Sequence, residues 1–287
     1  MRHQFASVNG LRMHYVEDGR GPLVILLHGF PEFWWSWRHQ IEPLVRAGYR
    51  VVAPDQRGYN DTDKSGPFDI DTLAADVCAL IEHADEPRAI VIGHDWGGAV
   101  AWHLAATRPE HCERLVVMNC PHPVMMRRAL TGNFRQMKRS WYMFFFLLPW
   151  LPEWWLLRNE ASVVARMIRA SAVDRSRFPR EELDAYREAI RKPGAASAAI
   201  GWYRAMLGKI FLGKKSGFKY PAIGVPSLLI WAMDDAALGY GDLVPGTERF
   251  APALRIEKIE RCGHFVQTEA PERVNPLLFA FLSEKRA

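Results

Sequence analysis

One ten-residue stretch, Ile90 to Ala99 (IVIGHDWGGA), constrains the fold of this 287-residue chain more than any other segment. An apolar run ends in Gly-His-Asp-Trp-Gly-Gly and then takes up a helical pattern, which predicts a strand, a sharp turn and a helix. Gly93 and Gly97 are small enough to let the chain turn so tightly that the side chain at the apex stands above a sheet. That apical residue is Asp95.

An acid at the apex of such a turn favours one kind of chemistry. An aspartate side chain ordinarily has a pKa of about 3.9, so it is ionised at neutral pH and needs no base to activate it. A serine in the same place would need one. We therefore expect Asp95 to attack a saturated carbon that bears a leaving group, and to become an ester of that carbon.

Strands and helices alternate on both sides of this turn, which predicts a parallel sheet covered by helices on both faces. The Asn9-Gly10 dipeptide predicts an antiparallel hairpin over residues 5–16. The continuous apolar run at 23–27 is typical of a strand buried on both faces. The other expected elements are helices over 37–47, 71–84, 97–108 and 271–282 and strands over 50–53, 90–93, 115–118, 227–231 and 255–259.

The alternation stops in the middle of the chain. From about Met125 to Lys219 the sequence is helical in pattern, rich in tryptophan and interrupted by prolines. The simplest organisation is an α/β core formed by residues 1–121 and 222–287, with an all-helical cap inserted at residues 122–221. Both ends of the insertion follow carboxyl ends of strands, the edge where open α/β sheets bind ligands, so we expect the cap above Asp95.

Charge and composition exclude several partners. The net charge is +5, and the basic residues that cluster do so without a nucleic-acid motif, so we expect a solvated helix face and no nucleic-acid partner. These clustered residues are Arg127, Arg128, Arg135, Lys138 and Arg139. The absence of a signal sequence in the first ten residues and four dispersed cysteines favour a cytoplasmic location. The most apolar run, 141–151, spans 11 residues. A transmembrane helix needs about 20, so we expect no stable membrane insertion.

An ester on Asp95 must be hydrolysed for turnover, which requires a base for water, most often a histidine oriented by a carboxylate. His264 follows the last expected strand, and the order nucleophile, acid, histidine is that of α/β-hydrolases. The orienting acid should follow the strand at 227–231, where Asp234 and Asp235 are adjacent. Neighbouring residues after a strand face different directions, so only one of the two is expected to reach His264.

Five ordered motifs make the chain similar to a known family over nearly its whole length. They are HGFPE at 28–32, PDQRGYN at 54–60, GHDWGG at 93–98, NCPHP at 119–123 and CGHF at 262–265. Together they resemble the epoxide hydrolases of the α/β-hydrolase superfamily. The resemblance implies the α/β-hydrolase fold, a mostly parallel central sheet flanked by helices, with an inserted all-helical cap. It selects Asp235 as the orienting acid, because in that family the acid lies four positions after the strand's tryptophan.

The same resemblance assigns roles to two tyrosines. Opening an epoxide expels an alkoxide, so the reaction needs a donor that stays protonated at neutral pH, and tyrosine with a pKa of about 10 meets that need. Epoxide hydrolases carry two such tyrosines on the cap, matched here by Tyr142 in SWYMFFF and Tyr203 in WYR. Leu147 stands where many relatives have glutamine, while Tyr186 and Tyr220 match neither segment. The implied substrates are a small apolar epoxide and water, with no cofactor and no metal.

The geometry of the sharp turn also predicts an oxyanion hole for the carbonyl of Asp95. Its donors would be the backbone N–H groups of Trp96 and of Phe30. The resemblance further implies a cis peptide at Phe30-Pro31. We expect most of the clustered aromatic side chains to pack the cap against the core and a minority to line a tunnel for apolar epoxides. These are Trp34, Trp35, Trp37, Phe144, Phe145, Phe146, Trp150, Trp154 and Trp155.

Four other functions are weighed against this one. A haloalkane dehalogenase also uses an aspartate nucleophile, but those enzymes usually carry asparagine where this chain has Phe30 and need no tyrosine donors. Fluoroacetate dehalogenases carry arginine at the position of Trp96, and a serine esterase lacks its nucleophile here. A non-catalytic binding protein on the same fold predicts a damaged triad, whereas Asp95, Asp235 and His264 are all present. The sequence leaves open whether the protein is a monomer or a homodimer.

Overall fold

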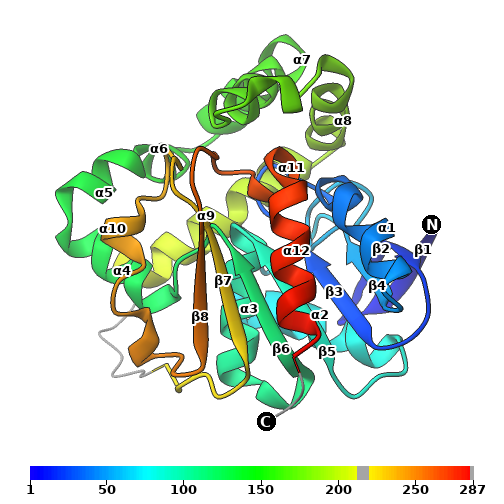
Figure 1. The fold of residues 1–287 in the computed structure, drawn as a ribbon. Helices are drawn as coiled ribbons and strands as arrows, with labels where there is room; N and C mark the ends of the chain where they lie inside the picture. The colour runs from blue at the N-terminus through cyan, green and yellow to red at the C-terminus, as the bar shows by residue number, and fades with distance from the viewer. Residues whose placement is uncertain (212–219, 285–287) are drawn as a thin grey trace.

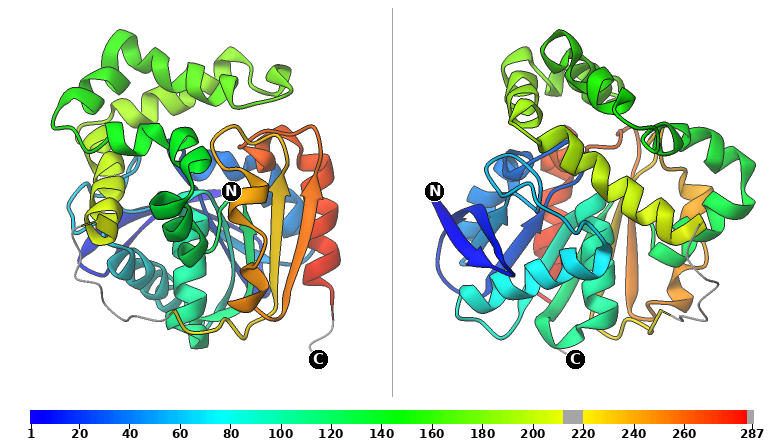
Figure 2. Two further views of the ribbon diagram at one scale, coloured as in Figure 1. Left: turned by 90° about the vertical axis from the view of Figure 1, so that its left-hand side faces the viewer. Right: turned by 180° about the vertical axis from the view of Figure 1, so that it is seen from behind.

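The computed structural model describes residues 1–211 and 220–284, which form a twisted sheet with helices on both faces and above one edge (Figures 1 and 2). The eight strands lie in the order β1-β2-β4-β3-β5-β6-β7-β8. The pairs β1 with β2 and β2 with β4 are antiparallel, and every later pair in this order is parallel. The strands are β1 (Arg2–Val8), β2 (Leu11–Asp18), β3 (Leu23–Leu27), β4 (Arg50–Pro54), β5 (Ala89–His94), β6 (Cys112–Met118), β7 (Ser227–Ala232) and β8 (Leu254–Ile259).

The sequence pattern explains this sheet. Val8 pairs with Leu11 across a two-residue turn, and both turn residues, Asn9 and Gly10, have the positive φ that a tight hairpin requires. Strands β3, β5 and β7 are buried along their whole length, as expected for strands covered on both faces. The predicted hairpin, parallel sheet and fold class are confirmed, and β4 and β6 extend beyond the expected ranges.

Four long helices cover the sheet. They are α1 (Arg38–Arg46), α2 (Ile70–His83), α3 (Trp96–Thr107) and α12 (Pro271–Leu282). Helices α1 and α12 lie in front of the sheet in Figure 1, while α2 and α3 lie on the opposite face, toward the viewer on the right of Figure 2. Helices α1, α2 and α12 bury part of their surface, and α3 is buried nearly all round. The first expected helix begins one turn earlier as a 3-10 helix at Trp34–Trp37, and the short helices α10 (Tyr240–Leu243) and α11 (Val266–Glu269) were not predicted.

Between β6 and β7 the described residues contain helices and no strand. We call residues 123–211 the helical insertion. It contains α4 (Pro123–Gly132), α5 (Phe134–Arg139), α6 (Trp141–Phe145), α7 (Leu151–Ala170), α8 (Arg180–Arg191) and α9 (Ala195–Phe211). Figure 1 shows α6, α7 and α8 above the carboxyl ends of the parallel strands. The expected helical stretch as far as Lys219 runs past Phe211 into residues 212–219, which lie outside the described part.

Most of the clustered aromatic side chains pack inside the molecule, as predicted. Trp37 and Phe146 are fully buried, whereas Trp150 and Trp154 are 71% and 55% exposed and lie on the surface instead. The four cysteines are buried and unpaired. Over residues 1–211 and 220–284, the structure contains no helix that is both long and apolar enough to cross a membrane.

Candidate active site

Asp95 lies at the sharp turn between β5 and α3, with φ 49° and ψ −120°. This backbone conformation is rarely adopted by non-glycine residues and costs on the order of 1–3 kcal/mol. The surrounding glycines permit it: a Cβ atom at Gly93 would collide with the backbone of Gly97, and one at Gly97 would collide with the backbone of Leu27. The predicted turn therefore places the carboxylate of Asp95 above the carboxyl ends of the strands.

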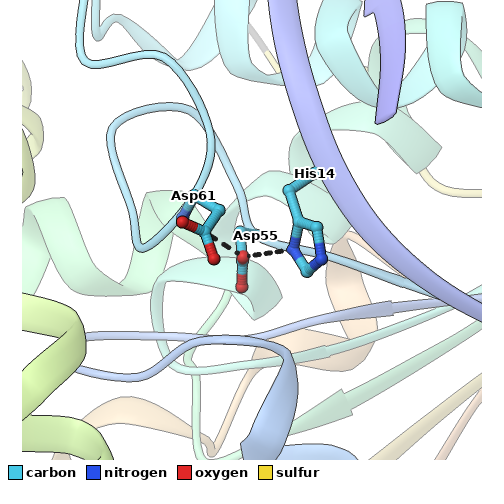
Figure 3. Close-up of side chains that lie close together, drawn as sticks. All are labelled: His14, Asp55 and Asp61. Carbon is cyan, nitrogen blue, oxygen red and sulfur yellow. Dashed lines mark hydrogen bonds and ion pairs between the residues drawn. The ribbon is translucent and has the colours of Figure 1, made fainter. Parts of the chain in front are cut away.

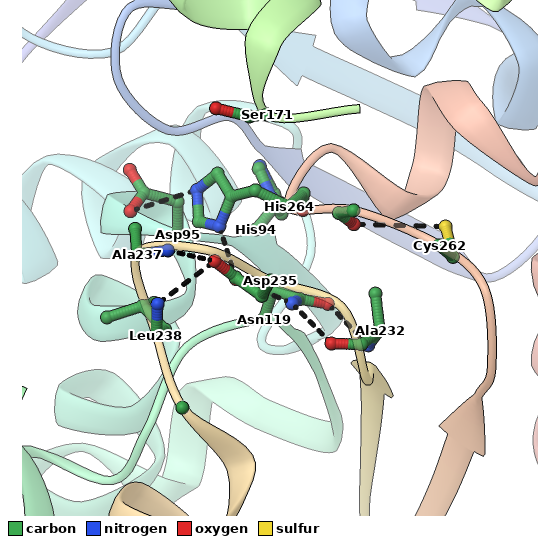
Figure 4. Close-up of polar contacts among 12 residues, drawn as sticks. His94, Asp95, Asn119, Ser171, Ala232, Asp235, Ala237, Leu238, Cys262 and His264 are labelled. Carbon is green, nitrogen blue, oxygen red and sulfur yellow. Dashed lines mark hydrogen bonds and ion pairs between the residues drawn. The ribbon is translucent and has the colours of Figure 1, made fainter. Parts of the chain in front are cut away.

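His264 faces this carboxylate (Figure 4). Its Nε2 atom lies 3.6 Å from Oδ2 of Asp95, and its Nδ1 atom lies 2.6 Å from Oδ2 of Asp235. Of the two adjacent acids that the sequence left open, Asp235 is thus the one in contact with His264, whereas Asp234 is exposed to solvent. Asp95, Asp235 and His264, which were predicted to act together, therefore lie close to one another. Their catalytic roles stay predictions.

Asp235 is held in place by several donors. Its Oδ1 accepts hydrogen bonds from the backbone N–H groups of Ala237 (2.8 Å) and Leu238 (2.9 Å), and its Oδ2 accepts one from Nδ2 of Asn119 (2.8 Å). Burial by itself would raise the pKa of Asp235, but His264 and these hydrogen bonds lower it below its ordinary value. Asp235 therefore stays ionised and fixes the orientation of the imidazole.

The protonation of His264 depends on both carboxylates. Burial alone would lower the pKa of this imidazole, but the charges of Asp235 and Asp95 outweigh burial and raise the pKa well above its usual value. Before any reaction, both carboxylates thus favour the protonated form of His264. Loss of the charge on Asp95 would remove one of the two groups that hold the proton there.

Backbone N–H groups surround the other oxygen of Asp95. The N–H of Phe30 donates to Oδ1 at 2.8 Å. Trp96 is the first residue of α3, so its N–H has no acceptor within the helix. The Phe30-Pro31 peptide is cis, as expected. Trp96 directly follows Asp95 in the chain. Of the two predicted oxyanion-hole N–H groups, that of Phe30 donates a hydrogen bond to the Asp95 carboxylate.

The two predicted tyrosines come from different helices and meet beside Asp95. Tyr142 lies on α6 and Tyr203 on α9, and their ring centroids are 6.1 Å apart. The ring of Tyr203 packs edge-on against Trp96 at 5.0 Å and Phe30 at 5.3 Å. Burial, and next the charge of Asp95, raise the pKa of both phenols above the ordinary value. Both phenols therefore keep their protons at any working pH.

Sequence reasoning missed an ion pair beneath the site. Nδ1 of His94 lies 2.6 Å from Glu32, and its Nε2 lies 2.9 Å from the backbone oxygen of His264. Each ring nitrogen of His94 therefore faces an oxygen that can accept a hydrogen bond from it. Glu32 also accepts hydrogen bonds from the N–H of Gly29 and from Nε2 of Gln267, each at 2.8 Å. The pair joins the segments that carry Phe30, Asp95 and His264, and its two members lie inside the HGFPE and GHDWGG motifs.

This pair gives stability a pH dependence. Burial alone would raise the pKa of Glu32, but His94 and the other donors lower it from 4.5 to about 2. A depressed carboxyl pKa stabilises the fold above pH 4.5, and this contribution is lost as the pH falls toward 2; it amounts to about 3 kcal/mol at neutral pH. We expect Glu32→Gln to lower the free energy of unfolding by about that much at pH 7, and by roughly half as much near pH 3, as urea titrations would measure.

The exposed Glu42, paired with Arg46 on α1, provides the matched control for this measurement. Glu42→Gln should change the free energy of unfolding by less than about 1 kcal/mol at either pH. An equal loss for Glu32→Gln at pH 7 and pH 3 would contradict the proposed pH dependence.

Glu269 is a second buried acid that sequence reasoning missed. Its Oε1 accepts hydrogen bonds from the N–H groups of Val173 (2.9 Å) and Asp174 (2.8 Å), and its Oε2 accepts one from Gly263 (2.9 Å). The N–H of His264 in turn donates to the backbone oxygen of Ser171 at 3.2 Å. Glu269 thus fastens the loop after α7 to the loop that carries His264. No local sequence signal indicates the contact with the loop after α7, because Val173 and Asp174 are 96 and 95 residues away from Glu269.

One other cluster has the composition of a metal site (Figure 3). It consists of His14, Asp55 and Asp61. Oδ2 of Asp55 already accepts hydrogen bonds from Nδ1 of His14 (2.6 Å) and Nδ2 of Asn60 (2.8 Å), and Oδ1 accepts one from the N–H of Trp34 (3.1 Å). Since both oxygens have donors, we assign Asp55 to ordering the loops after β3 and β4.

Comparison with known proteins decides the family. A family model described as the alpha/beta hydrolase fold matches residues 22–271. The chain belongs to this family. As an alpha/beta hydrolase it is an enzyme of the hydrolase class, and the resemblance noted in its motifs is confirmed by its relatives, several of which are named epoxide hydrolases.

Three similarities define the relationship. The chain is 44% identical over 98% of both chains to AB hydrolase superfamily protein YfhM of Bacillus subtilis. It is 34% identical to human Epoxide hydrolase 4, over 96% of this chain and 77% of the relative. The crystal structure of Bacillus megaterium epoxide hydrolase in complex with an inhibitor superposes with a TM-score of 0.90 at 29% identity, covering 98% of this chain and 100% of that one.

Proposed function

We propose that this hydrolase converts epoxides to vicinal diols in two steps, through an alkyl ester on Asp95. The observation that carries the proposal is the meeting of Tyr142 and Tyr203 beside the Asp95 carboxylate. A carboxylate nucleophile suits either an epoxide or an alkyl halide, but only the epoxide needs a proton on its leaving oxygen. Similarity to proteins named epoxide hydrolases supports the same reaction.

The first step forms the ester. Oδ1 of Asp95 is held by the N–H of Phe30, so Oδ2 is the oxygen free to attack an epoxide carbon. A new carbon–oxygen bond forms as the ring bond breaks, and the ring oxygen takes a proton from Tyr142 or Tyr203. The helical insertion acts as the cap in this proposal, because α6 and α9 carry the two tyrosines, and the ring of Tyr203 packs on Trp96 and Phe30 next to the nucleophile.

The second step hydrolyses the ester with a base that the first step prepares. Esterification removes the charge of Asp95, which is one of the two charges that keep the pKa of His264 high. The imidazole can then give up its proton to the tyrosine oxygen through solvent and accept one from an attacking water. The water oxygen bonds to Cγ of Asp95, and the oxyanion forms on Oδ1 beside the N–H groups of Phe30 and Trp96. Collapse breaks the bond to the alkoxide, which takes the proton from the imidazolium and leaves as the diol. The Asp95 carboxyl group then gives its remaining proton to His264 and both groups regain their starting charges.

Removing the phenol donors tests the assignment to epoxides. Tyr142→Phe and Tyr203→Phe should each slow ester formation about 10- to 100-fold, because each removes one donor to the leaving oxygen, and the double variant should lose at least about 1,000-fold. Stopped-flow single-turnover rates with an aryl epoxide measure this. Tyr186→Phe is the matched control, since Tyr186 is buried but its hydroxyl contacts Ser36, 3.1 Å away.

A matched pair of substrates completes this test. The wild-type enzyme should produce diol from the epoxide and release no halide from a 1-haloalkane of similar size. Halide release without diol, or single-turnover rates that the two tyrosine variants leave unchanged, would contradict the proposal.

A further inference from the structure

Exposed apolar side chains gather on one part of the helical insertion. We call the set Trp141, Leu147, Leu148, Trp150, Trp154 and Leu157 the apolar face. The three tryptophans are 59%, 71% and 55% exposed, and the three leucines are exposed as well. Single exposed apolar residues are ordinary, but six of them within residues 141–157 favour a surface that contacts a partner.

The backbone of this segment presents these side chains together. Trp154 and Leu157 are three residues apart near the start of α7, which places them on one side of the helix, and Trp150 precedes the helix as its N-cap residue with φ 50°. Pro152 and Leu156 are buried on the other side. The helix changes direction directly after this turn, because Asn159 and the two residues that follow it have positive φ. The apolar face is therefore short and faces solvent.

Unpaired cations flank the apolar face. Lys138 and Arg158 are exposed, and within the described part of the chain neither forms an ion pair; Arg158 lies over the ring of Trp154 at 5.2 Å. The acids nearby already have partners. Glu153 pairs with Arg204 at 2.7 Å, and Glu160 pairs with Arg187 at 3.1 Å. The border of the face is therefore positively charged.

We propose that the apolar face docks this enzyme onto a lipid membrane surface that carries anionic headgroups. Tryptophan side chains favour the interface between headgroups and hydrocarbon, and flanking lysine and arginine side chains bind anionic lipids. The exposed tryptophan and leucine side chains match the interface with the hydrocarbon, and the unpaired cations beside them match the anionic headgroups. Adsorption of this kind requires no helix that crosses the membrane.

A second copy of the chain fits the face less well. In a two-fold dimer the same patch meets itself, which would bring the cations of both copies together. The neighbouring acids Glu153 and Glu160 are already engaged in ion pairs, so neither is free to neutralise these charges. Anionic lipid provides the missing negative charge, which is why we commit to the membrane as the partner.

Docking would place the substrate path close to lipid. Trp141 packs on Phe145 with ring centroids 6.2 Å apart, and α6, which carries both residues, also carries Tyr142. Apolar epoxides partition into membranes, so an enzyme docked through this face would meet its substrate there. This consequence rests on the proposed function, whereas the docking itself does not.

Vesicle flotation tests the docking. We expect the wild-type protein to bind vesicles containing about one third phosphatidylglycerol roughly tenfold better than vesicles of phosphatidylcholine alone. Trp150→Ser combined with Trp154→Ser should lower binding at least about tenfold, and Arg158→Glu should lower it only on the anionic vesicles. Phe5→Ser, which removes an exposed aromatic ring from β1, should bind like the wild type.

Two measurements separate the possible outcomes. Epoxide turnover without vesicles should be unchanged in the double tryptophan variant, so a failure of docking and a failure of the proposed function can be told apart. Wild-type protein that binds neither vesicle, or a double variant that binds like the wild type, would overturn the proposal. A third outcome would also overturn it: the wild-type protein does not bind vesicles but forms a concentration-dependent dimer, measured by light scattering, and the double variant does not form this dimer.

Discussion

Asp95→Ala is expected to lower kcat for epoxide hydrolysis by at least about 10,000-fold, because no other described carboxylate lies where it can replace the nucleophile. The phenols of Tyr142 and Tyr203 would still be present and could polarise the epoxide, but the variant would lack the carboxylate that attacks the ring carbon. Steady-state diol formation, measured by chromatography at saturating substrate, provides the comparison.

Two further readouts show whether the Asp95→Ala protein is otherwise intact. Its unfolding temperature should stay within a few degrees of the wild-type value, because the side chain loses one hydrogen bond from Phe30 while the strained backbone of the turn is the same in both proteins. The pKa of His264, followed by NMR, should fall, since one of its two neighbouring carboxylates is gone. Diol formation within tenfold of the wild-type rate would remove Asp95 from the role of nucleophile.

His264→Gln is expected to leave the first step working and to stop the second. Glutamine can occupy the site beside Asp235 but cannot take a proton from water, so the ester on Asp95 should accumulate. Rapid mixing with an epoxide should consume one equivalent of substrate per enzyme, after which diol forms at least about 1,000-fold more slowly than in the wild type. The burst and the later slope are measured in one experiment.

His39→Gln is the matched control, because His39 lies on α1, outside the site. It should show neither a burst nor a loss of turnover. If His264→Gln instead consumed no substrate at all, His264 would be needed for the first step, and the division of labour between the tyrosines and the histidine would be wrong.

The sequence predicted the core of this molecule because buried parallel strands and sharp turns have strong local patterns. Leu23–Leu27 reads as an unbroken apolar run and is β3, and the glycines around Asp95 predicted the turn that the structure contains. His264 could be placed by its position after the last strand. The choice of Asp235 over Asp234 rested on family resemblance alone, since strand geometry says only that the two face different ways.

Contacts between distant segments were beyond the sequence patterns. Glu32 and His94 are 62 residues apart, and nothing in either segment indicates that the two side chains form a buried pair. The exposure of Trp150 and Trp154 could not be predicted from the sequence either, because tryptophan side chains are on average largely buried. Which side of α7 faces inward depends on how the helices of the insertion pack, which the sequence does not specify.

The most direct test of the account is the mass of the His264→Gln protein after it has been mixed with an epoxide. Opening of the ring by Asp95 adds the whole substrate and loses nothing, so the protein mass should rise by the full mass of one epoxide molecule. Peptide mapping should locate this increase on the fragment that contains Asp95. An unchanged mass, or an adduct on any other residue, would contradict the ester on Asp95.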